Sequence, residues 1–280
     1  MTDPATNAEQ RKFWSEDVGD VWARQAQAMD ATLAGVLDGL LARARLSTGA
    51  RVYDIGCGAG ASTRAIAAAV GETGHVTGLD ISEPLLAQAR AQNGGAEYLI
   101  ADAQSYAFDA QSADAVLSRF GVMFFSDTAA AFANMARALR PAGRMVFATW
   151  GAIPENPFFT LPARVAREVL GPVPKSDPDA PGPFALRDAD AVCAMLRGAG
   201  LAASVDTVNV PLPLGQDTGR IADTLQEIGP IPGAFRHHNA SAADRAATLA
   251  ALREALEEHR TPQGIVLGSQ IHYFTATKSA

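Results

Sequence analysis

The sequence has few basic residues for its length. Its 280 residues include 23 Lys and Arg against 30 Asp and Glu, which gives a formal net charge of −7 at pH 7 and an isoelectric point near 5.2. No run of Lys or Arg forms a basic cluster. Because the phosphates of nucleic acids and the headgroups of anionic membranes attract basic surfaces, we expect neither of them as the partner.

Cysteines and long apolar runs are also scarce. The two cysteines, Cys57 and Cys193, form no metal-binding pair and are too few for a disulfide framework. No apolar stretch is long enough to span a bilayer, and the polar N-terminus lacks the apolar core of a secretory signal. We therefore expect a cytoplasmic protein with no membrane span and no metal site.

Short apolar runs alternate with helical patterns between residues 47 and 150. The runs are RVYDIG, HVTGLD, AEYLIAD, ADAVLSRF and GRMVFATW. Strands that alternate with helices at this spacing indicate βαβ units. The sequence therefore predicts an α/β fold with a doubly wound, Rossmann-like, mainly parallel sheet.

The segments around this core predict one domain with helical additions. Residues 8–46 carry apolar positions at helical spacing, which predicts N-terminal helices. Prolines concentrate after Trp150, so we expect residues 151–187 and 211–262 to form lid segments that determine specificity. Residues 263–280 predict a long closing strand.

A glycine loop follows the first predicted strand and permits two interpretations. Gly56 and Gly58 with Ala61, and Asp80 about 20 residues further on, satisfy a relaxed dinucleotide fingerprint. The same loop also contains Gly60 and is preceded by an acid, Asp54. A carboxylate at this point repels a pyrophosphate, whereas S-adenosylmethionine has no phosphate and carries an ammonium group that an acid attracts.

Further polar residues lie at the ends of the other predicted strands, where sheets of this type bind ligands. Asp80 can accept hydrogen bonds from both ribose hydroxyls. Asp102 can accept from the adenine amino group, with the backbone N–H of Ala103 near the ring, and Ser118 ends the fourth strand. This order of groups favours S-adenosylmethionine as the cofactor, in a site at the carboxyl ends of the strands.

Residues 51–150 resemble class I S-adenosylmethionine-dependent methyltransferases of the type 11-like small-molecule group, which includes ubiquinone and menaquinone biosynthesis enzymes. The resemblance is carried by VYDIGCGAG, VTGLDIS, ADAQSYAF, ADAVLSRFGVMFF and ALRPAGRMVFATW. It implies a seven-stranded sheet whose last strand is antiparallel. It also implies that the N-terminal helix covers the cofactor. The cofactor contacts that we predict are Trp22, Gln25, Asp54, Gly56, Gly58, Gly60, Asp80, Ile81, Asp102, Ala103 and Ser118.

The sequence gives fewer indications of the residues that would bind the methyl acceptor. In-line methyl transfer to a phenol or alcohol needs a general base, for which His237 and His238 in the second lid segment are the candidates. Arg119 can pair with an acidic substrate group or with a nearby carboxylate, and Phe120 follows it. The candidate substrate contacts are Arg119, Phe120, Phe158, Phe184 and Phe235, which suit a small hydrophobic or aromatic acceptor.

Two other functions stay open at this stage. An NAD-dependent oxidoreductase would use the dinucleotide interpretation of the loop, and a non-catalytic protein could bind the cofactor without turnover. The sequence does not predict which acceptor atom receives a methyl group, the identity of the acceptor or the oligomeric state.

Overall fold

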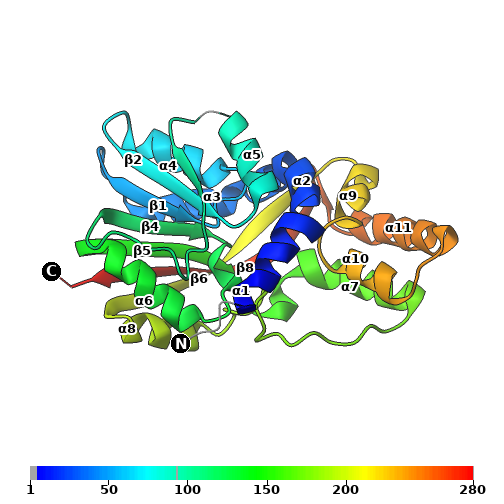
Figure 1. The fold of residues 1–280 in the computed structure, drawn as a ribbon. Coiled ribbons are helices and arrows are strands. Elements are labelled where there is room, and N and C mark those ends of the chain that lie inside the picture. The colour runs from blue at the N-terminus through cyan, green and yellow to red at the C-terminus, as the bar shows by residue number, and fades with distance from the viewer. Residues whose placement is uncertain (1–4, 93, 280) are drawn as a thin grey trace.

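The computed structural model describes residues 5–92 and 94–279, and a mixed β-sheet lies at its centre (Figure 1). The strand order is β3–β2–β1–β4–β5–β8–β6, with the short β7 paired to β8 alone. The strands are β1 (Arg51–Ile55), β2 (His75–Asp80), β3 (Glu97–Ile100), β4 (Ala113–Arg119), β5 (Leu139–Trp150), β6 (Leu201–Gly215), β7 (Arg260–Thr261) and β8 (Gly264–Lys278).

The first five strands are parallel, and the last strand is antiparallel to both of its long neighbours. In register, Val52 of β1 lies opposite Val76 of β2 and Ala115 of β4. Strand β8 enters between β5 and β6 in the reverse direction. This confirms the predicted doubly wound, mainly parallel sheet and its antiparallel last strand. The parallel strands therefore all end at the same edge of the sheet.

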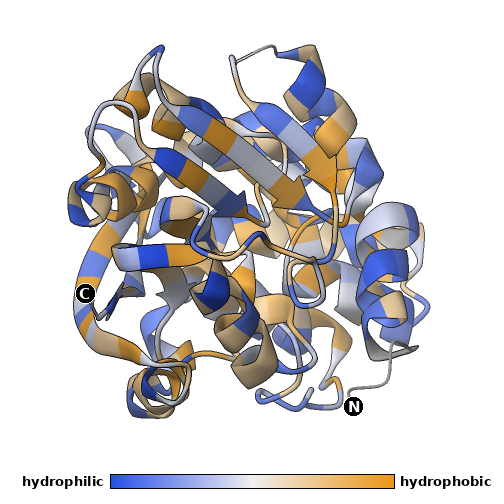
Figure 2. Cartoon of the chain, turned by 60° about the vertical axis from the view of Figure 1, so that its left-hand side comes forward, coloured by the Kyte–Doolittle hydropathy of each residue, from blue (hydrophilic) through white to orange (hydrophobic). Residues whose placement is uncertain are grey.

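Helices cover both faces of the sheet. Helices α3 (Ala34–Ala44), α4 (Ala61–Val70) and α5 (Glu83–Ala91) lie on one face, and α6 (Thr128–Ala138) and α8 (Ala189–Gly198) pack together on the other (Figure 1). Helix α8 begins at Asp188, whose side chain accepts from the N–H groups of residues 190 and 191. Figure 2 shows hydrophobic and hydrophilic residues alternating along the strands nearest the viewer, as expected when a strand has one better-covered face.

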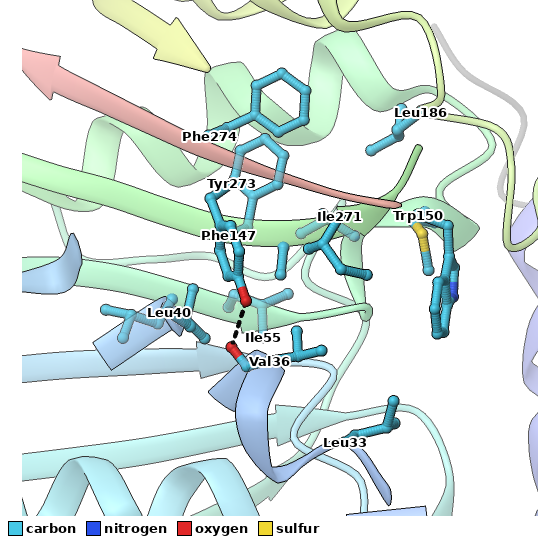
Figure 3. Close-up of a cluster of buried hydrophobic side chains, with 14 of the residues drawn as sticks. Leu33, Val36, Leu40, Ile55, Phe147, Trp150, Leu186, Ile271, Tyr273 and Phe274 are labelled. Carbon is cyan, nitrogen blue, oxygen red and sulfur yellow. Dashed lines mark hydrogen bonds between the residues drawn. The ribbon is translucent and has the colours of Figure 1, made fainter. Parts of the chain in front are cut away.

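The core lies where β5 and β8 meet helix α3 (Figure 3). The rings of Phe147 and Phe274 stack with centroids 4.9 Å apart, and Leu40 of α3 is also fully buried. The hydroxyl of Tyr273 donates to the carbonyl of Val36 at 3.1 Å, and burial raises the pKa of Tyr273 to about 12. This contact fixes the N-terminal helices against the end of the sheet.

The remaining helices lie beyond the carboxyl ends of the parallel strands. At the N-terminus, α1 (Ala5–Lys12) runs through the π-helical turn η1 (Phe13–Asp17) into α2 (Gly19–Thr32), so the predicted helical region is interrupted near Val18 and Leu33. The lid consists of α7 (Pro157–Leu170), α9 (Thr218–Leu225), α10 (Pro230–His237) and α11 (Ala242–Glu257), with α11 packed on α7 and α9.

Short single-turn helices and one extended strand complete the chain. The turns are η2 (Val122–Phe124) and η3 (Ile153–Glu155). Strand β6 continues to Gly215, so the second predicted lid segment begins as strand, and its helices start at α9. None of the described helices is both long and apolar enough to cross a membrane. The described residues also include no group of three or more His, Cys, Asp or Glu side chains placed to hold a metal ion.

Candidate active site

A cavity of about 980 Å³ opens at the carboxyl ends of the parallel strands, between the sheet, the N-terminal helices and the lid. It is the larger of the two described cavities by volume. Most of the predicted site residues meet there. Those that line the cavity are Trp22, Gly56, Gly58, Asp80, Ile81, Asp102, Ala103, Arg119, Phe120, Phe158 and Phe184. Those that do not are Gln25, Asp54, Gly60, Ser118, Phe235, His237 and His238.

The glycine loop needs its glycines because the chain turns tightly against its neighbour. Gly56 has φ +65°, and a Cβ there would lie 2.5 Å from the Cα of Gly121. Gly58 has φ +54°, and a Cβ there would meet no atom within 4 Å, because this position faces the open cavity. The loop therefore brings bare backbone to the cavity wall, where a ligand can approach closely.

Three N–H groups of this loop are already paired within the protein. Gly56 and Cys57 both donate to the carbonyl of Leu79, and Gly58 donates to Asp80 Oδ2 at 2.8 Å. These hydrogen bonds hold the loop to β2. The same three N–H groups are therefore not available to an anionic ligand such as a pyrophosphate.

Asp80 is the acid best placed for the ribose. It ends β2 and lines the cavity, and its Oδ1 accepts from the N–H of Ser82 at 2.9 Å. Burial raises the pKa of Asp80, against the opposing effect of the backbone hydrogen bonds. Each carboxylate oxygen has a second lone pair, so Asp80 can still accept from two ligand hydroxyls.

Asp102 also lines the cavity and already accepts hydrogen bonds from two sides. Its Oδ1 accepts from the N–H of Gln104 at 2.9 Å, and its Oδ2 accepts from the side-chain amide of Asn7 on α1. Ala103 beside it is buried and lines the same region. The N-terminal helix thus reaches the predicted adenine end of the site through Asn7, which the sequence did not single out.

Asp54 lies behind the loop rather than in the cavity wall. Its carboxyl group is fully buried, and Oδ2 accepts from the hydroxyls of Ser62 at 2.6 Å and Thr63 at 2.7 Å. These two hydroxyls belong to the first turn of α4 and bind the acid rather than the backbone of the helix. Burial raises the pKa of Asp54 to about 6, although both hydroxyls and the charge of Arg119 oppose this. Ser62, which lines the cavity, stands between Asp54 and any ligand.

The N-terminal segment is fastened across the cofactor side of the cavity. Ser82 Oγ donates to the carbonyl of Trp14 at 2.8 Å, and Ser15 Oγ donates to the carbonyl of Ile81 at 3.1 Å. Trp14 and Trp22 both line the cavity, with ring centroids 5.7 Å apart. This segment excludes water from the site, as the resemblance implies for the helix that covers the cofactor.

Three predicted contacts support the site from outside the cavity. Ser118 Oγ donates to the carbonyl of Ile55 at 2.7 Å and accepts from the N–H of Gly121, which fixes the loop after β4. Gln25 donates to Glu227 at 2.9 Å and so joins α2 to the lid. Gly60, at φ +84°, begins α4. None of these three residues lines the cavity, so a direct contact with a ligand is not supported for them.

Stacked aromatic rings form the wall on the acceptor side. Phe120 stacks on Trp150 with centroids 4.4 Å apart and planes 8° from parallel, and Phe158 stacks on the same indole at 6.1 Å. The ring of Phe159 packs edge-on against Trp150, with centroids 5.0 Å apart, and edge-on against Phe184, with centroids 4.9 Å apart. All five rings line the cavity, so this wall suits a flat or hydrophobic molecule.

One ion pair lies at the border of this wall. Arg119 Nη2 is 2.5 Å from Asp30 Oδ1 of α2, and both residues line the cavity. Arg119 therefore pairs with a nearby carboxylate, that of Asp30, as the sequence allowed. A second guanidinium group, that of Arg236 on α10, lines the lid side of the cavity.

The histidine pair does not reach the cavity. His237 is the last residue of α10 and His238 follows it, with their rings 4.8 Å apart at the outer end of this helix. Because α10 presents Pro232 and Arg236 to the cavity, the histidines lie outside the lining, which does not favour them as the general base. Phe235 is likewise buried in the lid, beneath the guanidinium of Arg245, and does not line the cavity.

Residues 53–147 match a family model described as a methyltransferase domain. About a third of the chain is thus similar to a methyltransferase domain. This confirms the resemblance on which the expected cofactor rests. The domain is 37% identical over 105 residues to aklanonic acid methyltransferase from Streptomyces sp. strain C5, which aligns 36% of this chain with 48% of the relative. It is 36% identical over 101 residues to demethylmenaquinone methyltransferase from Staphylococcus aureus, covering 35% and 42% of the two chains.

The chain thus spans less than half the length of these curated relatives. Solved structures of methyltransferases share the fold over a longer stretch. A putative methyltransferase from an antibiotic biosynthesis pathway of Anabaena variabilis has a TM-score of 0.59 at 19% identity, over 85% of this chain and 95% of that one. A phosphoethanolamine N-methyltransferase of Haemonchus contortus gives 0.57 at 18% identity, over 96% and 60%.

The cavity of the methyltransferase domain fits S-adenosylmethionine. The open backbone at Gly58 admits a ligand, and Asp80 offers free lone pairs at its ribose end, whereas the N–H groups of Gly56, Cys57 and Gly58 are bonded to the protein. Sequence reasoning missed Asn7, Trp14 and Asp30. These residues come from the N-terminal helices, and only the fold brings them to the strand ends.

Proposed function

We propose that this protein is an S-adenosylmethionine-dependent methyltransferase that methylates a small, hydrophobic or aromatic acceptor by in-line displacement. The observation that supports this is a single cavity with two unlike ends. Acidic side chains of Asp80 and Asp102 and the glycine loop line one end, and the stacked rings around Trp150 line the other. Relatives named for aklanonic acid and demethylmenaquinone are consistent with such an acceptor.

Different residues of the chain would bind the cofactor, exclude water and orient the acceptor. S-adenosylmethionine supplies a methyl carbon activated by its sulfonium when it is bound. Asp80 would hold the ribose hydroxyls, and Asp102 with Ala103 would hold the adenine. Trp14 and Trp22 exclude water, while the aromatic wall orients the acceptor so that its nucleophilic atom approaches in line.

Calorimetry with S-adenosylmethionine, S-adenosylhomocysteine and NAD tests the cofactor. We expect both sulfur ligands to bind and NAD not to bind, because the N–H groups of Gly56, Cys57 and Gly58 are paired. Tight NAD binding without a response to either sulfur ligand would show an oxidoreductase. Binding of S-adenosylmethionine with no formation of S-adenosylhomocysteine from a panel of phenols, quinols, amines and carboxylic acids would show a non-catalytic binding protein.

A further inference from the structure

Only one of the two terminal nitrogens of the Arg119 guanidinium group has a hydrogen-bond partner among the described residues. Nη2 donates to Asp30, whereas Nη1 is buried and has no partner in the part of the chain that the structure describes. The side chain is 12% exposed and lines the cavity. A buried donor without an acceptor is unfavourable, so this arrangement becomes more favourable once a ligand oxygen accepts from Nη1.

The position of Arg119 lies between the two ends of the cavity. The next residue, Phe120, begins the aromatic wall by stacking on Trp150. On the other side, Arg119 is close enough to the glycine loop for its charge to act on Asp54 behind it. A group held by Nη1 is therefore next to both the acceptor wall and the loop.

The cavity lining lacks the most common general base. Among the described residues, no histidine lines it, and each of its four carboxylates has at least one protein donor. Asp30 accepts from Arg119, Glu227 from Gln25, Asp80 from Gly58, and Asp102 from Gln104. A phenol or alcohol must lose a proton to a base when it is methylated. A carboxylic acid is already ionised at neutral pH and needs none.

We infer that the acceptor is a hydrophobic carboxylic acid, that Arg119 binds its carboxylate, and that the product is a methyl ester. This inference rests on the proposed methyltransferase function. A carboxylate oxygen forms the new O–CH₃ bond while the C–S bond of the sulfonium breaks, and the electron pair of that bond stays on sulfur. The donor becomes a neutral thioether and no proton is released. A carboxylate also matches the planar donor pair of a guanidinium better than any neutral acceptor does.

Binding of two matched probes tests the role of Arg119. In protein saturated with S-adenosylhomocysteine, quenching of tryptophan fluorescence measures the affinities of 2-naphthoate and 2-naphthamide, which differ in charge but share the ring. We expect naphthoate to bind at least about 10-fold more tightly. Arg119→Gln should abolish this preference, and Arg119→Lys should restore part of it. Arg164→Gln, on the exposed face of α7, is the matched control and should leave the preference intact.

Equal affinity for the two probes, or a preference that persists in Arg119→Gln, overturns the inference. A second arm separates the acceptor carboxylate from that of the cofactor. If Arg119→Gln weakens S-adenosylhomocysteine but not 5′-methylthioadenosine, which lacks the amino-acid portion, Arg119 serves the cofactor and the inference is wrong. Unchanged affinity for both supports it. Failure of the unaltered protein to bind S-adenosylhomocysteine at all counts instead against the proposed function.

The chemical form of the product gives an independent test. The protein is incubated with S-adenosylmethionine labelled in the methyl group and an acid-soluble metabolite extract, and the products are treated with alkali. Label released as volatile methanol identifies a methyl ester and supports the inference. Label that stays in alkali-stable products overturns the ester while leaving the methyltransferase function in place. No labelled product in any fraction overturns both.

Discussion

At the scale of single residues, Asp54 is the group with the largest consequence for stability. It is fully buried, its Oδ1 has no partner among the described atoms, and no cation touches it. Because its pKa of about 6 in the folded protein lies above the ordinary value of 3.8, folding favours the protonated form. As the pH rises through 6, the folded protein loses this proton and must then hold a buried negative charge.

Asp54→Asn should remove this pH dependence. In the wild type, the contribution of Asp54 to the free energy of unfolding is greatest below pH 4 and falls as the pH rises to 6. The total loss is roughly 3 kcal/mol, since one pKa unit corresponds to about 1.4 kcal/mol. Urea denaturation should show the variant gaining that amount relative to the wild type between pH 4 and pH 8. A difference that stays constant with pH would contradict the raised pKa, and Asp38→Asn, exposed on α3, controls for loss of a carboxylate.

The residue types at the strand ends could be predicted from the sequence, but the directions in which their side chains point could not. Asp80 and Asp102 line the cavity as predicted, because the carboxyl ends of parallel strands meet at one edge. Asp54 occupies the same kind of position, yet its side chain points to Ser62 and Thr63 behind the loop. Sequence spacing does not distinguish these two outcomes, since both place an acid after an apolar run.

At the scale of elements, the N-terminal segment covers the site because Gly19 can lie very close to the backbone of Trp14. Gly19 begins α2 directly against η1, and a Cβ at this position would collide with the carbonyl oxygen of Trp14 and lie 3.1 Å from Ser82 Oγ. The same two atoms form the hydrogen bond that fastens η1 to the start of α5. Glycine at position 19 thus allows the segment to lie flat over the cofactor side of the cavity.

Gly19→Ala should weaken cofactor binding and leave the stability of the fold nearly unchanged. The added methyl group displaces η1 from Ser82, so the affinity for S-adenosylhomocysteine should fall by roughly 5- to 10-fold, the equivalent of about one lost hydrogen bond. The thermal unfolding of the sheet should change little, because Gly19 does not contact it. Calorimetry measures the first effect and circular dichroism the second. Gly198→Ala in α8, where a Cβ would meet no atom within 4 Å, should leave affinity unchanged.

Elements with local signals were predicted well, and those fixed by tertiary contacts were not. The capping box of Ser241 and Asp244 at the start of α11 is present as its spacing predicts. Ser82 precedes α5 at the N-cap position, but its hydroxyl donates to the carbonyl of Trp14 rather than capping the helix. The histidine pair lies outside the cavity because the orientation of α10 depends on its packing against α7, which no local pattern encodes.

At the scale of the whole molecule, the cavity joins parts of the chain that are distant in sequence. Its walls come from the N-terminal helices, the strand ends of the sheet, the aromatic wall and the lid. The hydrogen bond from Gln25 to Glu227 joins two of these parts, α2 and the lid, directly. A ligand that contacts several walls at once binds the folded state only, so its binding free energy adds to the stability of the whole domain.

Ligand-induced stabilisation should therefore identify the cofactor and its ribose contact together. S-adenosylhomocysteine at 100 times its dissociation constant adds about 2.7 kcal/mol to the free energy of unfolding, which corresponds to a rise in melting temperature of roughly 5–10 °C for a domain of this size. Asp80→Asn should lose most of this rise, because an amide offers one acceptor oxygen in place of two. Differential scanning fluorimetry measures both. NAD at the same concentration should give no rise, and a rise with NAD but none with S-adenosylhomocysteine would contradict the proposed cofactor.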